Sequence, residues 1–375
     1  MNSILYTTIM VILWIVNLFN GTGLGEAYQT TERARVIIYI IFVIIVLVNY
    51  KKKHCYVKRQ NLIILGSMSC LFIFDSYIQG YGMEGLNYIS VFALVYILSK
   101  METKEKAIRL TGIVYLVSGI VVLYTYNYGT VFSGWNPNTI GMIALYSYLI
   151  YLIPFYNYEG KISGKIIITA TTILYIMLIA PTDSRSCIWF SIVAILIVLS
   201  IIPRTAIVKA DRKYVWLLLI PLFVAVFVVG VSKGNYMTEL NLWSIKKFEK
   251  PLFNGRDILW EQGFQSLFEN FLFGTGSLEG NWHNCLVSIA TAYGFLGGLL
   301  WVMSLRSILS KAKCWINDAI VSGCIISFAI IYIQQSVELG LVHESPNILP
   351  YIVVGMMLGR VKFLNKLVKR NGRLK

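Results

Sequence analysis

Long apolar runs recur from one end of this chain to the other, and they restrict it to a membrane-embedded fold. A helix crosses the ~30 Å hydrocarbon core of a bilayer with about 17 to 25 residues, most of them apolar. Hydrophobic residues make up 57% of the sequence, and the mean hydropathy is +0.67. The runs do not alternate apolar with polar residues as lipid-facing barrel strands do. We therefore predict an all-α, polytopic integral membrane protein.

About twelve of these runs are candidates for transmembrane helices. They show no internal repeat, and we expect a single membrane domain over residues 1–375. The predicted spans are 3–19, 34–50, 61–78, 86–99, 110–127, 139–157, 166–180, 186–202, 214–231, 284–305, 318–336 and 347–359.

Basic residues gather in alternate connections between these spans. Connections on the cytoplasmic side of a membrane collect Lys and Arg. Most of the 33 basic residues fall in the segments 51–59, 100–109, 157–165, 203–213, 306–317 and 360–375. We therefore expect both termini in the cytoplasm, and we interpret Arg360 to Lys366 as an anchor along the membrane surface. The net charge of +15 follows from this pattern, and it predicts attraction to anionic lipid with no nucleic-acid binding.

One extracytoplasmic loop, residues 232–282 between predicted spans 9 and 10, is far longer than the others. Long connections are often functional lids or binding elements. A spacing of three to four residues predicts an amphipathic helix in it, with an apolar stripe made of Trp260, Phe264, Leu267, Phe268 and Phe271. Such a helix could also simply lie on the bilayer surface.

Arg256 stands at the start of that helix. If Asn254 is the cap, Arg256 lies in the first turn, where the positive end of the helix dipole disfavours a cation unless both share an anion. This predicts a phosphate site. The alternative is a solvated arginine paired with Asp257 or Glu261.

A second arginine, Arg185, lies in a short polar turn between two apolar runs at the same side. An ionisable group at membrane depth costs ~2.5 to 3.5 kcal/mol on insertion scales and marks a functional site, unless a neighbour such as Asp183 pairs with it. His283 ends the long loop, just before a predicted span. A histidine there could accept a proton from an attacking hydroxyl, or it could be a hydrogen-bonded interfacial residue.

Together, Arg185, Arg256 and His283 suit chemistry on a lipid-linked diphosphate. Guanidinium groups hold the diphosphate as negative charge develops on it, and the histidine activates a hydroxyl. The chain has three histidines, on separate connections, and no His-Glu-x-x-His motif, so we expect no metal site and no cofactor.

Several motifs between about 130 and 300 resemble those of one family. They are Trp135 to Gly141, Ser184-Arg185-Ser186, Asn254-Gly255-Arg256 with Trp260, Phe273 to Gly276, His283-Asn284 and Tyr293 to Gly297. This set is similar to the signature of the O-antigen polymerase and ligase family (Wzy-type), the polytopic glycosyltransferases of bacterial surface-polysaccharide assembly. The first 130 residues match only as hydrophobic spans.

The resemblance implies a GT-C-like fold in the bacterial cytoplasmic membrane, acting on undecaprenyl-diphosphate-linked oligosaccharides at its outer face. By that resemblance Arg185 and Arg256 bind diphosphate and His283 is the base, with Asn138, Asp257 and Asn284 in supporting positions. Neither metal nor nucleotide sugar is implied. A chain-length regulator and a flippase are the implied protein partners. The short separation of Arg256 from His283 favours a polymerase over a ligase.

Two further classes stay open. A transporter or flippase for lipid-linked sugars would show helices broken by Gly or Pro in two related halves, and the sequence shows no such pair. A cell-wall polymerase of the shape-and-division type would need an acidic residue with its own motif in an outer loop, which the sequence does not reveal.

Overall fold

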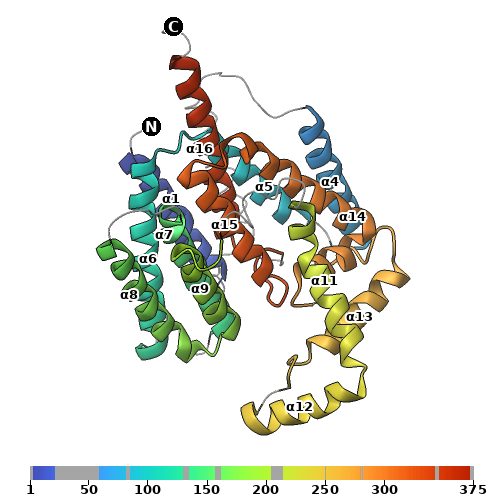
Figure 1. The fold of residues 1–375 in the computed structure, drawn as a ribbon. Helices are drawn as coiled ribbons and strands as arrows, with labels where there is room; N and C mark the ends of the chain where they lie inside the picture. The colour runs from blue at the N-terminus through green and yellow to red at the C-terminus, as the bar shows by residue number, and fades with distance from the viewer. Residues whose placement is uncertain are drawn as a thin grey trace.

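The computed structural model describes residues 3–21, 59–81, 85–129, 135–156, 162–203, 214–249, 251–278, 280, 282–342 and 346–371. These residues fold into helices, with no strand among them (Figure 1). The helices are α1 (Ser3–Gly21), α4 (Arg59–Ile78), α5 (Gly85–Lys100), α6 (Glu105–Tyr128), α7 (Pro137–Leu152), η1 (Ile153–Phe155), α8 (Ile162–Ile179), η2 (Ala180–Thr182), α9 (Arg185–Val198), α11 (Tyr214–Ser232), α12 (Asn235–Phe248), α13 (Arg256–Glu269), α14 (Cys285–Leu309), η4 (Ser310–Trp315), α15 (Ala319–Gln334) and α16 (Leu349–Asn371).

The predicted apolar runs fall on helices. The predicted span 34–50 lies outside the described residues, and each of the other predicted spans overlaps a helix. Among the described segments, those both long and apolar enough to cross a membrane are Glu105–Tyr128, Pro137–Phe155, Ile162–Thr182, Tyr214–Ser232 and Cys285–Trp315. The all-helical prediction is confirmed, whereas the count of twelve spans stays a prediction.

Large apolar side chains are exposed on the outward faces of α6, α8 and α11. On α6 they recur at helical spacing, and each of Ile113, Val117, Val121 and Tyr124 is more than half exposed. A continuous apolar surface of this kind is unfavourable in water but suits contact with lipid. The outward faces are therefore compatible with a surrounding membrane.

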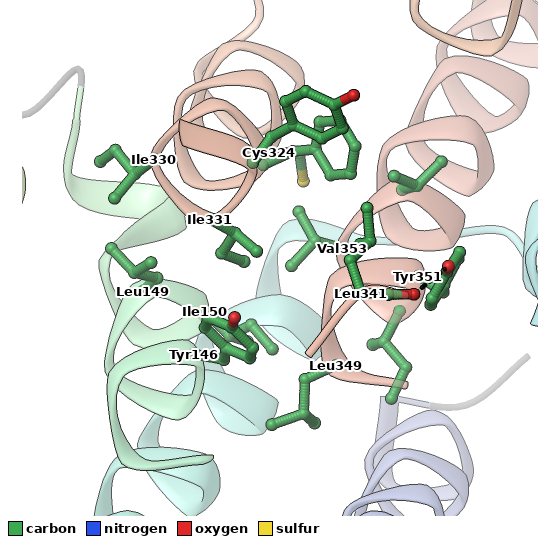
Figure 2. Packing of buried hydrophobic residues seen from close by; sticks show 14 of the residues in the cluster. Tyr146, Leu149, Ile150, Cys324, Ile330, Ile331, Leu341, Leu349, Tyr351 and Val353 are labelled. Carbon is green, nitrogen blue, oxygen red and sulfur yellow. Dashed lines mark hydrogen bonds between the residues drawn. The ribbon is translucent and has the colours of Figure 1, made fainter. Parts of the chain in front are cut away.

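The interior is built around α7 and α15, which pack together with α16. Figure 2 shows Tyr146 and Ile150 of α7 beside Ile331 of α15 and Val353 of α16. The backbones of α15 and η1 approach so closely that a Cβ on Gly323 would overlap a carbonyl oxygen. A helix surrounded on all sides in this way has no polar face, which explains the mostly apolar sequence of α15.

The start of α1 and the end of α16 lie at one end of the bundle, which we call the terminal end, and α12 and α13 lie at the other (Figure 1). At the terminal end, Arg360 pairs with Asp318 at 2.8 Å and Lys366 pairs with Glu102. Burial alone would raise the pKa of Glu102, but the hydrogen bond and charge of Lys366 lower it. Three of the basic connections thus meet at one end. Their cytoplasmic location stays a prediction.

The surface-anchor interpretation of Arg360 to Lys366 is wrong. The helix α16 continues through this segment to Asn371, and Arg360 is only 9% exposed. Its pairing with Asp318 neutralises the charge that would otherwise direct the segment to the membrane surface.

The connection between α11 and α14 holds two helices at the end opposite the termini (Figure 1). The predicted amphipathic helix is α13, whereas α12 was not expected. Trp260 of α13 is 1% exposed and donates to the carbonyl of Trp282 at 2.6 Å. Phe268 is 74% exposed, so only the first part of the apolar stripe is buried.

The helix α14 is broken at Tyr293 and Gly294, where Gly294 has a φ of 66°. The preceding segment 271–276 supplies the missing hydrogen bonds. Backbone N–H groups of Phe295 and Leu296 donate to Phe271 and Leu272, and those of Thr275 and Gly276 donate to Thr291 and Ala292. A Cβ on Gly274 or Gly294 would overlap the facing backbone. Two of the family-like motifs therefore form one backbone joint.

Candidate functional site

Arg256 is the first residue of α13, and a tight turn sets its direction. The two residues before it, Asn254 and Gly255, have left-handed backbones with φ of 54° and 78°. Such conformations suit Asn and Gly best. The N-cap is Gly255, and no side chain caps the helix. The expected Asn254 cap is wrong, because the helix begins at Arg256 and Gly255 occupies the N-cap position.

Arg256 pairs with a residue that the sequence did not single out. Its Nη2 donates to Oε1 of Glu338 at 3.0 Å, and both side chains are largely buried. The sequence alternative of pairing with Asp257 or Glu261 is wrong, since Glu261 pairs with Lys233 at 2.7 Å. The Nε of Arg256 is buried and has no hydrogen-bond partner within the described part of the chain. One donor of the guanidinium is thus unused.

His283 faces the same carboxylate. Its Nδ1 lies 3.7 Å from Oε2 of Glu338, and the side chain is 30% exposed. That nitrogen makes no hydrogen bond to any described residue. The backbone of His283 is left-handed, with a φ of 47°. Strain at a residue other than glycine is often kept where the side chain has a function.

Asn284 is fully buried and holds the backbone next to His283. Its Oδ1 accepts from the N–H groups of Leu286 and Val287, both at 3.1 Å, and so caps α14. Its Nδ2 donates to the carbonyls of Pro221 and Ser336. The amide has no hydrogen-bonding capacity left for a ligand, so its support of the site is structural.

Glu338 lies on a braced turn between α15 and α16. Oε1 of Gln335 accepts from the N–H groups of Gly340 and Leu341 at 2.7 and 2.6 Å. Nε2 of Gln335 donates to the hydroxyl of Tyr146, which ties the turn to α7. A sequence signal exists for this residue, because Gln334-Gln335-Ser336 and Glu338 form a polar cluster directly after an apolar run.

Arg185 is the first residue of α9 and lies beside this cluster without joining it. Its side chain is exposed. The next residue, Ser186, donates to Oε1 of Glu338 at 3.5 Å and accepts from Gln334 at 3.4 Å. The structure brings the predicted turn to the site through Ser186.

Asn138 and Asp257 lie near helix starts. Asn138 is the second residue of α7, and its N–H donates to the capping side chain of Asn136 at 2.9 Å. One turn further, Gly141 packs so closely on Ser184 that a Cβ would overlap it. Asp257 is in the first turn of α13, where a negative charge suits the helix dipole. Neither side chain makes a hydrogen bond or ion pair with Arg256, His283 or Glu338.

Metal ligands do not cluster in the residues that the structure describes, since no three His, Cys, Asp or Glu side chains come together. No family model, curated protein or solved structure matches this chain. The likeness to the O-antigen polymerase and ligase family therefore rests on the motif residues alone.

Proposed function

We propose that this protein is a polymerase of bacterial surface polysaccharide, such as O-antigen or capsule, with a GT-C-like fold. The growing glycan on one undecaprenyl diphosphate is transferred through its reducing end to a lipid-linked repeat unit. The reaction takes place at the outer face of the cytoplasmic membrane. A flippase would supply the repeat units, and a chain-length regulator would set the product length.

One observation carries the proposal: Arg256 and His283 lie on either side of the Glu338 carboxylate. Arg256 lies near the middle of the connection between α11 and α14, His283 lies at its end, and each belongs to a motif that resembles the family signature. A guanidinium with an unused donor and a histidine beside it combine an anion binder with a proton acceptor.

The proposed step is a displacement at the anomeric carbon of the donor glycan. A sugar hydroxyl of the acceptor repeat forms a new C–O bond to that carbon. The bond from the carbon to the diphosphate oxygen breaks, and its electron pair leaves with the diphosphate. His283 takes the hydroxyl proton, while Arg256, assisted by Arg185, stabilises the charge on the departing diphosphate.

A hollow of about 830 Å³ between α11 and α13 could hold the lipid part of the donor. Val226 and Val229 of α11 and Phe264 and Phe268 of α13 line it, so its walls are mainly apolar. The same helix α13 begins at Arg256. A diphosphate at Arg256 with its prenyl chain along α13 is consistent with this arrangement.

A ligase of the same family would use the same contacts to move the finished glycan to lipid A core or another acceptor. Neighbouring genes distinguish the two, because flippase and glycosyltransferase genes indicate a polymerase and core-biosynthesis genes indicate a ligase.

A transporter is the second candidate, because α14 is broken at Gly294 and the adjacent α11 contains Pro221. Broken helices bind substrate in many transporters, but there they occupy corresponding positions of two related halves. The sequence shows no two related halves, so α11 and α14 do not fit this pattern.

The first test is the purified joining reaction with two variants of His283. His283→Asn keeps a residue that tolerates the left-handed backbone, whereas His283→Ala also strains it. Both should reduce joining of lipid-linked repeats by ~10² to 10⁴-fold, the usual loss on removing a general base. Binding of undecaprenyl diphosphate should stay near the wild-type level.

The reaction is run with and without a chelator, and we expect wild-type joining to continue with it. Joining at the wild-type rate by His283→Asn would show that His283 is not the base. Loss of binding in both variants would instead indicate a structural role.

A further inference from the structure

The buried carboxylate of Glu338 uses both of its oxygens at the site. Oε1 accepts from Nη2 of Arg256 at 3.0 Å and from the hydroxyl of Ser186 at 3.5 Å. Oε2 faces Nδ1 of His283 at 3.7 Å. A single charged group thus contacts three chain segments that are far apart in the sequence.

Burial makes this arrangement costly unless the charge is used. Glu338 is 5% exposed, and a buried carboxylate loses most of its hydration. An ionised carboxylate at this depth needs a cation, which Arg256 supplies. A neutral amide could satisfy Ser186 but would not balance the guanidinium.

Side-chain hydrogen bonds hold the backbone turn that carries Glu338. Gln335 closes the turn by accepting from Gly340 and Leu341, and it is anchored to α7 through Tyr146. Arg256 follows two left-handed turn residues, and His283 is itself left-handed. The braced turn thus places the Glu338 carboxylate between these two side chains.

We propose that Glu338 is a positioning residue that aligns the base with the diphosphate binder; this rests on the proposed function. By facing Nδ1, the carboxylate keeps that nitrogen protonated and leaves Nε2 to accept the proton of the acceptor hydroxyl. The 3.7 Å separation is slightly longer than a hydrogen bond, and such catalytic contacts often tighten when substrate binds.

The test combines Glu338→Gln with His283→Asn in the purified joining reaction. Glu338→Gln alone should lower kcat roughly 10- to 100-fold, the loss seen when a histidine loses its carboxylate partner in metal sites. Binding of undecaprenyl diphosphate should be unchanged or tighter, because the guanidinium is released from its carboxylate. In the His283→Asn background, adding Glu338→Gln should cost no further rate.

Glu338→Asp serves as the conservative variant and should recover part of the rate that Glu338→Gln loses. Glu239→Gln on the exposed side of α12 is the matched control and should behave as wild type. A wild-type kcat in Glu338→Gln, or a fully additive loss in the double variant, would overturn the positioning role. A wild-type protein that joins no repeats overturns both the proposed function and this inference. When the wild-type protein does join repeats, a wild-type kcat in Glu338→Gln overturns the positioning role alone.

Discussion

At the scale of single residues, the guanidinium of Arg256 is the most informative group. It is partly buried, it shares Glu338 with His283, and its Nε lacks a partner among the described residues. A planar fork with one donor engaged keeps other N–H groups for a phosphate. An ammonium group has no such geometry.

We therefore predict that Arg256→Lys fails nearly as completely as Arg256→Ala. Joining should fall by roughly 10²-fold or more, the typical effect of removing a donor to a developing negative charge. In cells, long-chain polysaccharide should disappear while single repeats persist on lipid. Gel analysis of chain length measures both.

Arg306→Lys is the matched control for this substitution, because Arg306 is exposed in the last turn of α14, far from the site. Wild-type chain lengths in Arg256→Lys would show that Arg256 acts only as a surface charge.

Arg185→Ala should weaken binding of undecaprenyl diphosphate while the protein folds normally.

The sequence pointed to Arg256 and His283 because local patterns mark them: one begins an amphipathic helix and the other precedes an apolar run. It missed Glu338 because the importance of that residue comes from a contact across 82 positions. For Arg185 the turn was located correctly, but Ser186 makes the contact. Which side chain of a helix start points inward depends on packing that sequence spacing does not fix.

At the scale of elements, the break in α14 gives a structural role to two glycine-containing motifs, Phe273 to Gly276 and Tyr293 to Gly297. Hydropathy shows one continuous apolar run from 284 to 305, because a backbone break leaves composition unchanged. The break exists only because segment 271–276 supplies the hydrogen bonds that α14 loses. The helix α12 was not expected, although Tyr236, Leu240 and Trp243 recur in it at helical spacing.

This joint predicts a contrast between two glycines of the same helix. Gly294→Ala should destabilise the protein strongly, because its φ of 66° is unfavourable for alanine and the new Cβ would overlap the backbone of Leu272. Gly298→Ala should be neutral or stabilising by up to about 1 kcal/mol, since its nearest contact would be an ordinary 3.7 Å. Thermal unfolding in detergent compares them. Equal stability of the two variants would contradict the joint.

At the scale of the whole molecule, the structure separates two kinds of connection. Three of the basic connections meet through Asp318, Glu102 and the end of α16, whereas Glu338, Arg256 and His283 meet away from them. The count of basic residues predicted this separation, because alternate connections between spans lie on opposite sides of a membrane. It could not predict that three connections at one end share a single carboxylate.

The central claim is that this site joins lipid-linked repeats. The most direct measurement supplies purified protein, reconstituted in vesicles, with the undecaprenyl-diphosphate-linked repeat unit of its host, and follows glycan length and release of undecaprenyl diphosphate. We predict products of two or more repeats, with one undecaprenyl diphosphate released for each bond formed, and loss of these products in His283→Asn. Movement of intact repeats across the vesicle membrane without any joining would contradict the claim and identify a transporter.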